Sequence, residues 1–496
     1  MDHRRQGPSG PLPPGRAPGP RPAQKKTSLL QNLNALLDRA LSTSTQPARH
    51  AAHALAQLVA LGRHTLTGVL TAQNRQQQDW TADYRFYSRG RVQPQALLDT
   101  ARQSVEAALP PDSPLVVAVD DSLLPKTGRH IHGAAWRRDP QGPPFQVQFT
   151  WAQRVLQFSA ARPLGTEGAV RLVPIDFIHA PTPAKPRKGA DAATQAAHVQ
   201  AAKQANLVAL AQRRLVALRA QVPEDRPIHV VGDGRYSNKT LLRQRPAGTV
   251  YIGRIRKDSA LFHRPPAQPA TGRKRLYGAK TRTPEQLRQA ADQPWQTVQA
   301  HACGKVHEFK VKVLADVRSP LCGGHPVQVV VMAPLGYRLR QGGKLLYRQP
   351  GYLLCTDATL PVPQVVQEYL WRWDIEVNFR EEKTHLGVGQ AQVRVPAAVE
   401  GVPALAVGAY ALLQLAALET YGDAGQPDTV PLPQWRRRHP PARATTGRLI
   451  NQLRYELWAS ALRPESLAGF TSPSASDTKP EKPEPHLASA AFHAIN

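Results

Sequence analysis

The sequence contains little cysteine. Three cysteines occur in 496 residues, at Cys303, Cys322 and Cys355, and no two of them form a Cys-x-x-Cys pair. A disulfide framework needs several cysteine pairs and a standard zinc knuckle needs closely spaced cysteines, so neither is indicated. We therefore expect a protein of a reducing compartment, whose 41% apolar residues are enough to build a sizeable core.

Long hydrophobic segments are also scarce. The N-terminal residues are rich in Pro, Gly and Arg and contain no apolar stretch typical of a signal peptide. The most apolar later stretch, residues 402–418, is a run of Ala and Leu that includes Tyr410 and Gln414. We interpret this stretch as a buried core helix and expect no membrane partner.

Acidic residues are few relative to basic ones. Asp and Glu together number 36 against 64 Lys and Arg, which gives a formal net charge of +28. In a long chain with ordinary core segments, this surplus indicates a polyanionic partner, and nucleic acid is the leading candidate.

Composition and hydrophobic periodicity divide the chain into seven segments. Two tails cannot bury enough apolar surface to fold and are predicted to be disordered. The predicted segments are a basic tail (1–27), a helical DNA-binding domain (28–109), the first part of a core (110–257), a β-rich insertion (258–350), the second part of the core (351–420), a C-terminal helical region (421–465) and a second tail (466–496).

The predicted N-terminal domain combines helical periodicity with basic and aromatic residues. Such interleaving suits contact with the DNA backbone, although the aromatic side chains could equally be core residues. The residues concerned are Arg63, Arg75, Arg85, Arg89 and Arg91, with Trp80, Tyr84, Phe86 and Tyr87 among them.

From residue 114 the pattern changes to short apolar runs bounded by turns, with helical periodicity between some of them. This alternation predicts a mixed α/β architecture. The predicted strands are 115–119, 145–149, 155–158, 170–178, 228–231, 250–255, 306–314 and 327–332, and the predicted helices include 192–222, 239–243 and most of 353–418.

Two of the predicted strands end in carboxylates. The run VVAVDD delivers Asp120 and Asp121, and the run IHVVGDG delivers Asp233 between two glycines that leave room for a metal or a phosphate. A carboxylate at a strand end can face a cleft while the strand stays buried. Ordinary turn chemistry at Asp120 and a helix-start role for Asp233 remain open at this point.

The third candidate is a helix over residues 368–387. A step of about 100° per residue places Tyr369, Arg372, Glu376 and Lys383 within one wedge of about 60°. Apolar stripes flank this wedge, so the polar row should face a partly buried cleft. The alternative is a salt-bridge ladder on a solvated helix.

These residues resemble a known family. Tyr369, Arg372, Glu376 and Lys383 match, in order and spacing, the signature of the IS4-type DDE transposases of bacterial insertion sequences. The resemblance covers about residues 114–418.

Two further segments carry the resemblance. VVAVDDSLLPKTG is similar to the first-aspartate segment of the IS701-like branch, and VVGDGRYSN is similar to the second-aspartate strand. Ser122 stands where that branch usually has Thr, and residues 133–148 lack its pattern. The superfamily is therefore better supported than the branch.

The resemblance implies an α/β fold with a ribonuclease-H-like mixed-sheet catalytic core. It implies that Asp120, Asp233 and Glu376 hold two Mg²⁺ ions, for which Mn²⁺ could substitute, with Asp121 as the alternate to Asp120. Two such ions neutralise charge on the entering and leaving oxygens of a phosphodiester, and hard cations prefer carboxylate oxygens. The residues expected to bind DNA phosphates are Tyr369, Arg372, Lys383 and Lys126.

The function implied is that of a DNA transposase, which cleaves and rejoins insertion-sequence ends by metal-dependent hydrolysis and strand transfer. Its expected partners are transposon-end DNA, target DNA and a second copy in a synaptic homodimer. Its expected location is the bacterial cytoplasm, in association with the nucleoid. Two alternatives stay open: a catalytically inactive, domesticated DNA-binding regulator and a ribonuclease-H-like nuclease.

Overall fold

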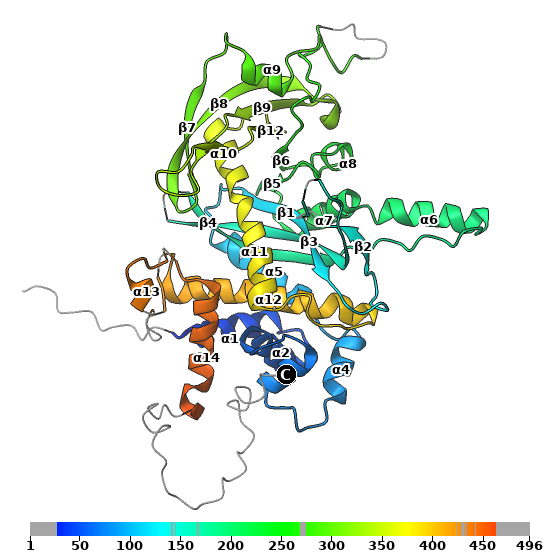
Figure 1. Ribbon diagram of the computed structural model, residues 1–496, viewed down its shortest axis with the longest axis vertical. Coiled ribbons are helices and arrows are strands. Elements are labelled where there is room, and N and C mark those ends of the chain that lie inside the picture. Colours follow the sequence, from blue (N-terminus) through cyan, green and yellow to red (C-terminus); the bar gives the residue numbers. More distant parts are fainter. Residues whose placement is uncertain are drawn as a thin grey trace, which may run out of the picture.

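The structure is a computed structural model in which residues 27–139, 142–143, 145–165, 168–267, 274–423, 425–427, 432, 434–441 and 443–462 are described. The two tails that the sequence predicts to be disordered lie almost wholly outside these residues. In the described chain, helices come first and last and the strands lie between them, and all pack in layers around one large sheet (Figure 1).

The centre of the sheet is built from five strands in the order β4-β3-β1-β5-β6. β3 is antiparallel to β1 and to β4, whereas β5 and β6 run parallel to β1. This mixed arrangement confirms the α/β, ribonuclease-H-like core. The strands are β1 (Leu115–Pro125), β3 (Phe149–Leu164), β4 (Ala169–His179), β5 (Ile228–Gly232) and β6 (Thr249–Arg254).

The strands of the segment predicted as a β-rich insertion extend this same sheet beyond β6. β12 pairs with both β6 and β9, and β8 and β7 follow at the edge. A separate two-stranded sheet pairs β10 with β11. These elements are α9 (Pro284–Gln289), β7 (Gln296–Ala302), β8 (Lys305–Arg318), β9 (Pro326–Met332), β10 (Gly336–Tyr337), β11 (Leu346–Tyr347) and β12 (Gly351–Cys355), with a 3-10 turn at Pro320–Cys322.

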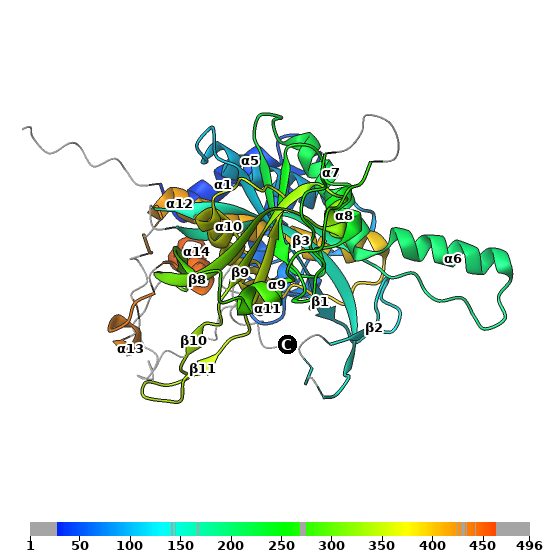
Figure 2. The same ribbon diagram turned by 90° about the horizontal axis from the view of Figure 1, so that it is seen from above.

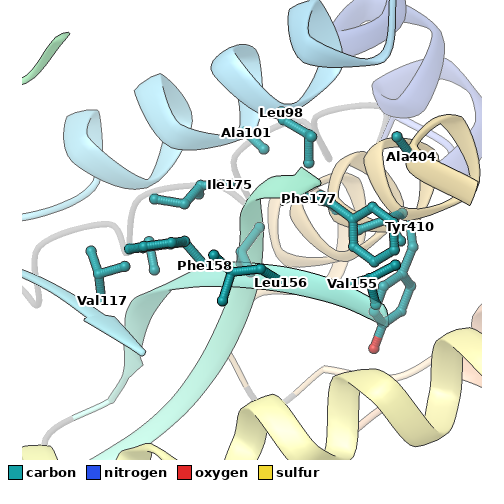
Figure 3. Packing of buried hydrophobic residues seen from close by; sticks show 14 of the residues in the cluster. Leu98, Ala101, Val117, Val155, Leu156, Phe158, Ile175, Phe177, Ala404 and Tyr410 are labelled. Atoms are coloured by element: carbon teal, nitrogen blue, oxygen red, sulfur yellow. The ribbon is translucent and has the colours of Figure 1, made fainter. Parts of the chain in front are cut away.

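The N-terminal helices and α12 (Pro396–Tyr421) cover one face of the sheet (Figures 1 and 2). Figure 3 shows Phe158, Ile175 and Phe177 of the sheet in one apolar cluster with Leu98 of α5 and Tyr410 of α12. The N-terminal helices are α1 (Leu29–Ala40), α2 (Pro47–Val59), α3 (Leu66–Ala72), α4 (Thr81–Ser88) and α5 (Pro94–Ala107), and α14 (Thr446–Leu462) packs beside α1 and α2.

In the described part of the chain, α12 is the one helix long and apolar enough to cross a membrane. Its mean hydropathy is 1.7 over the most apolar window, and 89% of that window is buried inside the protein. It is buried in the manner expected of a core helix.

Two helices, α10 (Val362–Trp371) and α11 (Trp373–His385), pack on the opposite face of the sheet. Val366, Ile375 and Phe379 meet Val116 and Ala118 of β1 in a second apolar cluster. This packing fixes the helices above the strand that carries Asp120.

Several elements differ from the prediction. The single helix expected at 192–222 is two helices, α6 (Ala192–Gln204) and α7 (Leu207–Gln221), because Asn206 accepts hydrogen bonds from the first amides of α7 and so starts a new helix. β2 (Ala135–Arg138) was not predicted, and the strand expected at 145–149 begins only at Phe149. The remaining helices are α8 (Lys239–Arg243) and α13 (Gln434–Arg437).

Two glycines of α12 allow a test of its packing. A Cβ at Gly408 would lie 2.9 Å from the Leu97 Cβ, whereas one at Gly401 would lie 3.6 Å from the Val92 Cβ. Gly408→Ala should lower the free energy of unfolding by about 1–2 kcal/mol, because overpacking outweighs the gain in helix propensity.

The matched change Gly401→Ala should raise the free energy of unfolding by about 0.5–1 kcal/mol, because its contact is ordinary and the propensity gain remains. Urea unfolding of both variants measures these shifts. Equal effects of the two substitutions would show that α5 and α12 are not this closely packed.

Candidate active site

The first two candidate carboxylates are neighbours because of strand register. β1 and β5 run parallel, and Val119 pairs with Gly232. Asp120 and Asp233, the next residues of each chain segment, therefore lie side by side on strands about 4.8 Å apart. Asp233 follows the last residue of β5, as predicted, but β1 continues past Asp120 to Pro125 because it stays paired with β3, so the prediction that this strand ends at its carboxylates is wrong.

Strand alternation separates Asp120 from Asp121. Asp120 lies on the same face as Val116 and Ala118, which pack under α10 and α11. Asp121 points to the other face, where it accepts a hydrogen bond from the Tyr236 hydroxyl at 3.2 Å. Arg154 and Arg235 also lie 3.6 Å from the Asp121 carboxylate.

The helix that carries Glu376 is tightened where α10 meets α11. The prediction of one continuous helix is wrong at Arg372, which separates the two helices. The amide of Arg372 donates to the Tyr369 carbonyl, and the amide of Ile375 donates to the Arg372 carbonyl, so both bonds span three residues instead of four.

One guanidinium connects two of the candidate carboxylates. Arg372 Nη1 lies 3.2 Å from Asp120 Oδ2, and Arg372 Nη2 lies 3.1 Å from Glu376 Oε1. The Arg372 side chain is 12% exposed, and its Nε is buried without a hydrogen-bond partner among the described residues. The structure thus brings Asp120 and Glu376 to the same cation.

The other two residues of the polar row also have partners at this site. Lys383 Nζ donates to the Ser122 hydroxyl at 2.6 Å. The Arg372 guanidinium lies 5.8 Å from the centre of the Tyr369 ring, within the range of a cation–π contact. The apolar stripes beside this row are not fully covered, because Trp373 in one of them is 57% exposed.

The local electrostatics leave this site short of positive charge. Burial raises the pKa of Asp120 to about 7, an effect that Arg372 opposes and that Asp233 and Asp121 reinforce. Burial also raises the pKa of Asp121 and lowers that of Lys383. A further cation at this edge would therefore stabilise the ionised form of Asp120.

The donor set fits a hard divalent cation in its chemistry. The side chains around the site offer carboxylate oxygens, which Mg²⁺ and Mn²⁺ prefer over nitrogen and sulfur. Across the described residues, however, no three His, Cys, Asp or Glu side chains already form a metal-binding group. Arg372 lies between Asp120 and Glu376 and contacts both carboxylates.

Lys126 has other partners in the structure. At the end of β1, its ammonium group donates to the carbonyls of Gly389 at 2.6 Å and Ala391 at 2.9 Å. Burial lowers its pKa to about 8. The structure therefore joins Lys126 to the loop after α11 and does not bring it to the carboxylates.

The glycine before Asp233 serves packing. A Cβ at Gly232 would lie 2.8 Å from the Tyr251 hydroxyl, whereas a Cβ at Gly234 would meet only the Arg254 carbonyl at 3.7 Å. The Tyr251 hydroxyl in turn donates to the Asp233 carbonyl at 3.3 Å. Gly232 thus admits a tyrosine that supports the backbone of Asp233.

Sequence reasoning missed two buried acids on α10 and α11. Glu368 is buried against His229, with 2.8 Å between Glu368 Oε2 and His229 Nδ1. Glu382 is buried and accepts a hydrogen bond from Gln157 Nε2 at 2.9 Å. The partners His229 and Gln157 both lie within predicted strands. A polar residue inside an apolar strand was the sequence signal that indicated a buried polar partner.

Comparison with known proteins gives the family. The family model described as DDE superfamily endonuclease matches residues 36–305, and the chain belongs to this family. The match includes Asp120 and Asp233 and ends before Glu376, so the placement of Glu376 rests on the structure. A search of curated proteins finds no match to the chain. Enzymes of this class are nucleases that generally use divalent metals.

The buried Glu382 predicts a pH dependence of stability. Burial raises its pKa to about 8 from an ordinary 4.5, against the opposing effects of Gln157 and Lys383. The folded chain therefore holds a proton that the unfolded chain releases, and this stability is lost as pH rises toward and through 8.

Glu382→Gln keeps the shape without the titration. Between pH 6 and pH 9 the urea midpoint of the wild-type chain should fall, and that of the variant should fall much less. Parallel curves for the two proteins would show that Glu382 does not titrate in this range.

Proposed function

We propose that the chain is a DNA transposase that cleaves and rejoins insertion-sequence ends, with Asp120, Asp233 and Glu376 as its metal ligands. The observation that carries the proposal is the meeting of Asp120 and Glu376, from distant parts of the chain, at the Arg372 guanidinium. The family supports nuclease chemistry in general. The IS4-type spacing of the polar row supports transposition.

In the proposed reaction, the carboxylates hold the metal ions, and the basic and tyrosine side chains bind DNA phosphates. Two Mg²⁺ ions, or Mn²⁺ in their place, would neutralise charge on the entering and leaving oxygens and lower the pKa of the attacking hydroxyl. Arg372, whose buried Nε has no hydrogen-bond partner in the described part of the chain, would bind a phosphate beside the break. Lys383 and Tyr369 would hold further phosphate oxygens on the same side of the helix.

Asp120 is preferred over Asp121 as the ligand. Its carboxylate shares the sheet face with Glu376, whereas Asp121 is paired with Tyr236 and two arginines on the other face. A ligand to a shared ion has to lie on the same face as Glu376. We assign Asp121 to holding the loop after β5 through Tyr236.

The proposed partners are transposon-end DNA, target DNA and a second copy of the chain in the synaptic complex. In the N-terminal domain, Arg63, Arg85, Arg89 and Arg91 are exposed and available to phosphates. Phe86 and Tyr87 are core residues, and Arg75 is paired with Asp83 at 3.1 Å. A role in the bacterial nucleoid follows from these partners.

Glu376→Gln separates cleavage from binding. The substitution keeps the shape but removes the charge that fixes a divalent ion, so end cleavage in Mg²⁺ should fall by orders of magnitude while binding in EDTA stays near normal. Denaturing gels and gel shifts measure the two activities. Cleavage at the wild-type rate would show that α11 carries a salt-bridge ladder.

Arg372→Ala is the complementary variant. It removes a charge-assisted phosphate contact and should weaken end binding by about 1.5–3 kcal/mol in EDTA. Unchanged affinity would assign Arg372 a purely structural role between Asp120 and Glu376.

The two adjacent aspartates form a matched pair. Asp120→Asn should reduce cleavage by orders of magnitude, because a ligand on the α11 face is lost. Asp121→Asn should leave most of the cleavage rate and mainly lower thermal stability, because it weakens the contacts with Tyr236, Arg154 and Arg235. The reverse order of cleavage rates would make Asp121 the ligand.

A further inference from the structure

An arm projects from the edge of the sheet that carries the candidate site. It consists of the loop 180–191 and helix α6, and it extends away from the body in both views (Figures 1 and 2). No side chain of α6 is buried. Isolated helices of about this length are marginal in water, so α6 lacks the packing that normally stabilises a helix.

Strand topology places the base of the arm near the carboxylates. The chain leaves β4 at His179, which pairs with Val155, and Val155 pairs with Ser122. His179 is thus two strand spacings, about 10 Å, from Ser122. The chain returns through α7 to enter β5, so α7 starts at the edge where β5 ends beside Asp233.

The arm carries a net positive charge. The exposed residues Lys185, Arg187 and Lys188 precede α6, and Lys203 lies near its end. Asp191 is the one acid between residues 181 and 204, and its carboxylate is used to accept the Thr194 amide at 2.7 Å as the helix cap. The arm is therefore complementary to a polyanion.

The surface of α6 suits a DNA groove better than a protein. Val199 is its one large exposed hydrophobic residue, at 50% exposure, and it has no aromatic residue. Protein interfaces need apolar and aromatic anchors, which α6 lacks. Its alanines leave a slim helix, and the major groove of duplex DNA, about 12 Å wide, admits one.

One side of α6 carries the groups that could reach bases. At about 100° per residue, Gln200, Lys203 and Gln204 fall on one arc together with Ala197, and all four are exposed. Ala201 and His198, which follow Ala197 beyond the edge of this arc, are partly covered. The outward arc offers amide and ammonium donors between small side chains.

We propose that the arm holds duplex DNA next to the cleavage site, with Lys185, Arg187 and Lys188 on phosphates and the outward arc of α6 in the major groove. α6 is about 20 Å long, so the arm would follow the duplex for roughly six base pairs. The inference rests on the proposed function, because DNA at the carboxylates is what brings the duplex to the arm.

The charge of the loop is tested with a triple variant, Lys185→Ala, Arg187→Ala and Lys188→Ala. The full chain binds a mixed-sequence duplex in EDTA, and fluorescence anisotropy gives affinity against salt. Loss of three phosphate contacts should reduce the log–log salt slope by about 2.7. The control removes the same charge from the exposed residues Arg436, Arg437 and Arg438, and its slope should change by less than about 1.

The helix is tested by two single changes that both keep good helix formers. Ala197→Glu places a negative charge on the outward arc and should weaken duplex binding about tenfold, whereas Ala202→Glu, on the opposite side, should weaken it less than about threefold. Affinity for a single strand of the same sequence should change equally in both variants, because it has no major groove.

Several results would overturn the proposal. Equal slopes for the two triple variants would mean that net charge alone matters. A loss of self-association in sedimentation by Ala197→Glu, with duplex affinity unchanged, would assign α6 to a second copy of the chain. If the wild-type chain binds and cuts DNA but the arm variants match it, the arm inference fails alone. If the wild-type chain neither binds nor cuts, the proposed function fails with it.

Discussion

The bridge from Asp120 through Arg372 to Glu376 is the interaction on which the site depends. It joins the middle of β1 to the start of α11, and with Lys383 on Ser122 it sets the helix above the strand. A buried carboxylate without a counter-charge would be costly, and the pKa of Asp120, raised to about 7 mainly by burial, reflects this. Arg372 thus supplies a counter-charge to both Asp120 and Glu376.

The rest of the fold holds this bridge in place from both sides of the sheet. Below, α12 packs on β4 and α5 packs on β4 and β3, and Val117 of β1 belongs to the same apolar cluster (Figure 3). Above, the second apolar cluster holds α10 and α11 against Val116 and Ala118. Because β1 has an apolar cluster on each face, its middle presents Asp120 to one face and Asp121 to the other.

Much of the sheet could be predicted from the sequence, because strands such as β5 are short apolar runs bounded by turns. The row from Tyr369 to Lys383 also followed from helical geometry. The break at Arg372, the pairing of Lys126 with the loop after α11 and the burial of Glu382 could not be predicted, since each depends on contacts with residues far away in the sequence. Asn206 is a residue type that often caps helices, but it lies within a helical periodicity that continues on both sides. The sequence therefore predicted one long helix where the structure has two.

The central claim is that Asp120, Asp233 and Glu376 hold divalent ions when DNA is bound. A DNA phosphate then takes the place of Asp120 and Glu376 as the partner of Arg372. Anomalous diffraction from crystals of the chain with Mn²⁺ and duplex DNA tests it directly. The account predicts anomalous peaks about 2.1 Å from oxygens of all three carboxylates, with the Arg372 guanidinium moved to a phosphate. Peaks away from these carboxylates, or an Arg372 still bridging Asp120 and Glu376 in the complex, would contradict it.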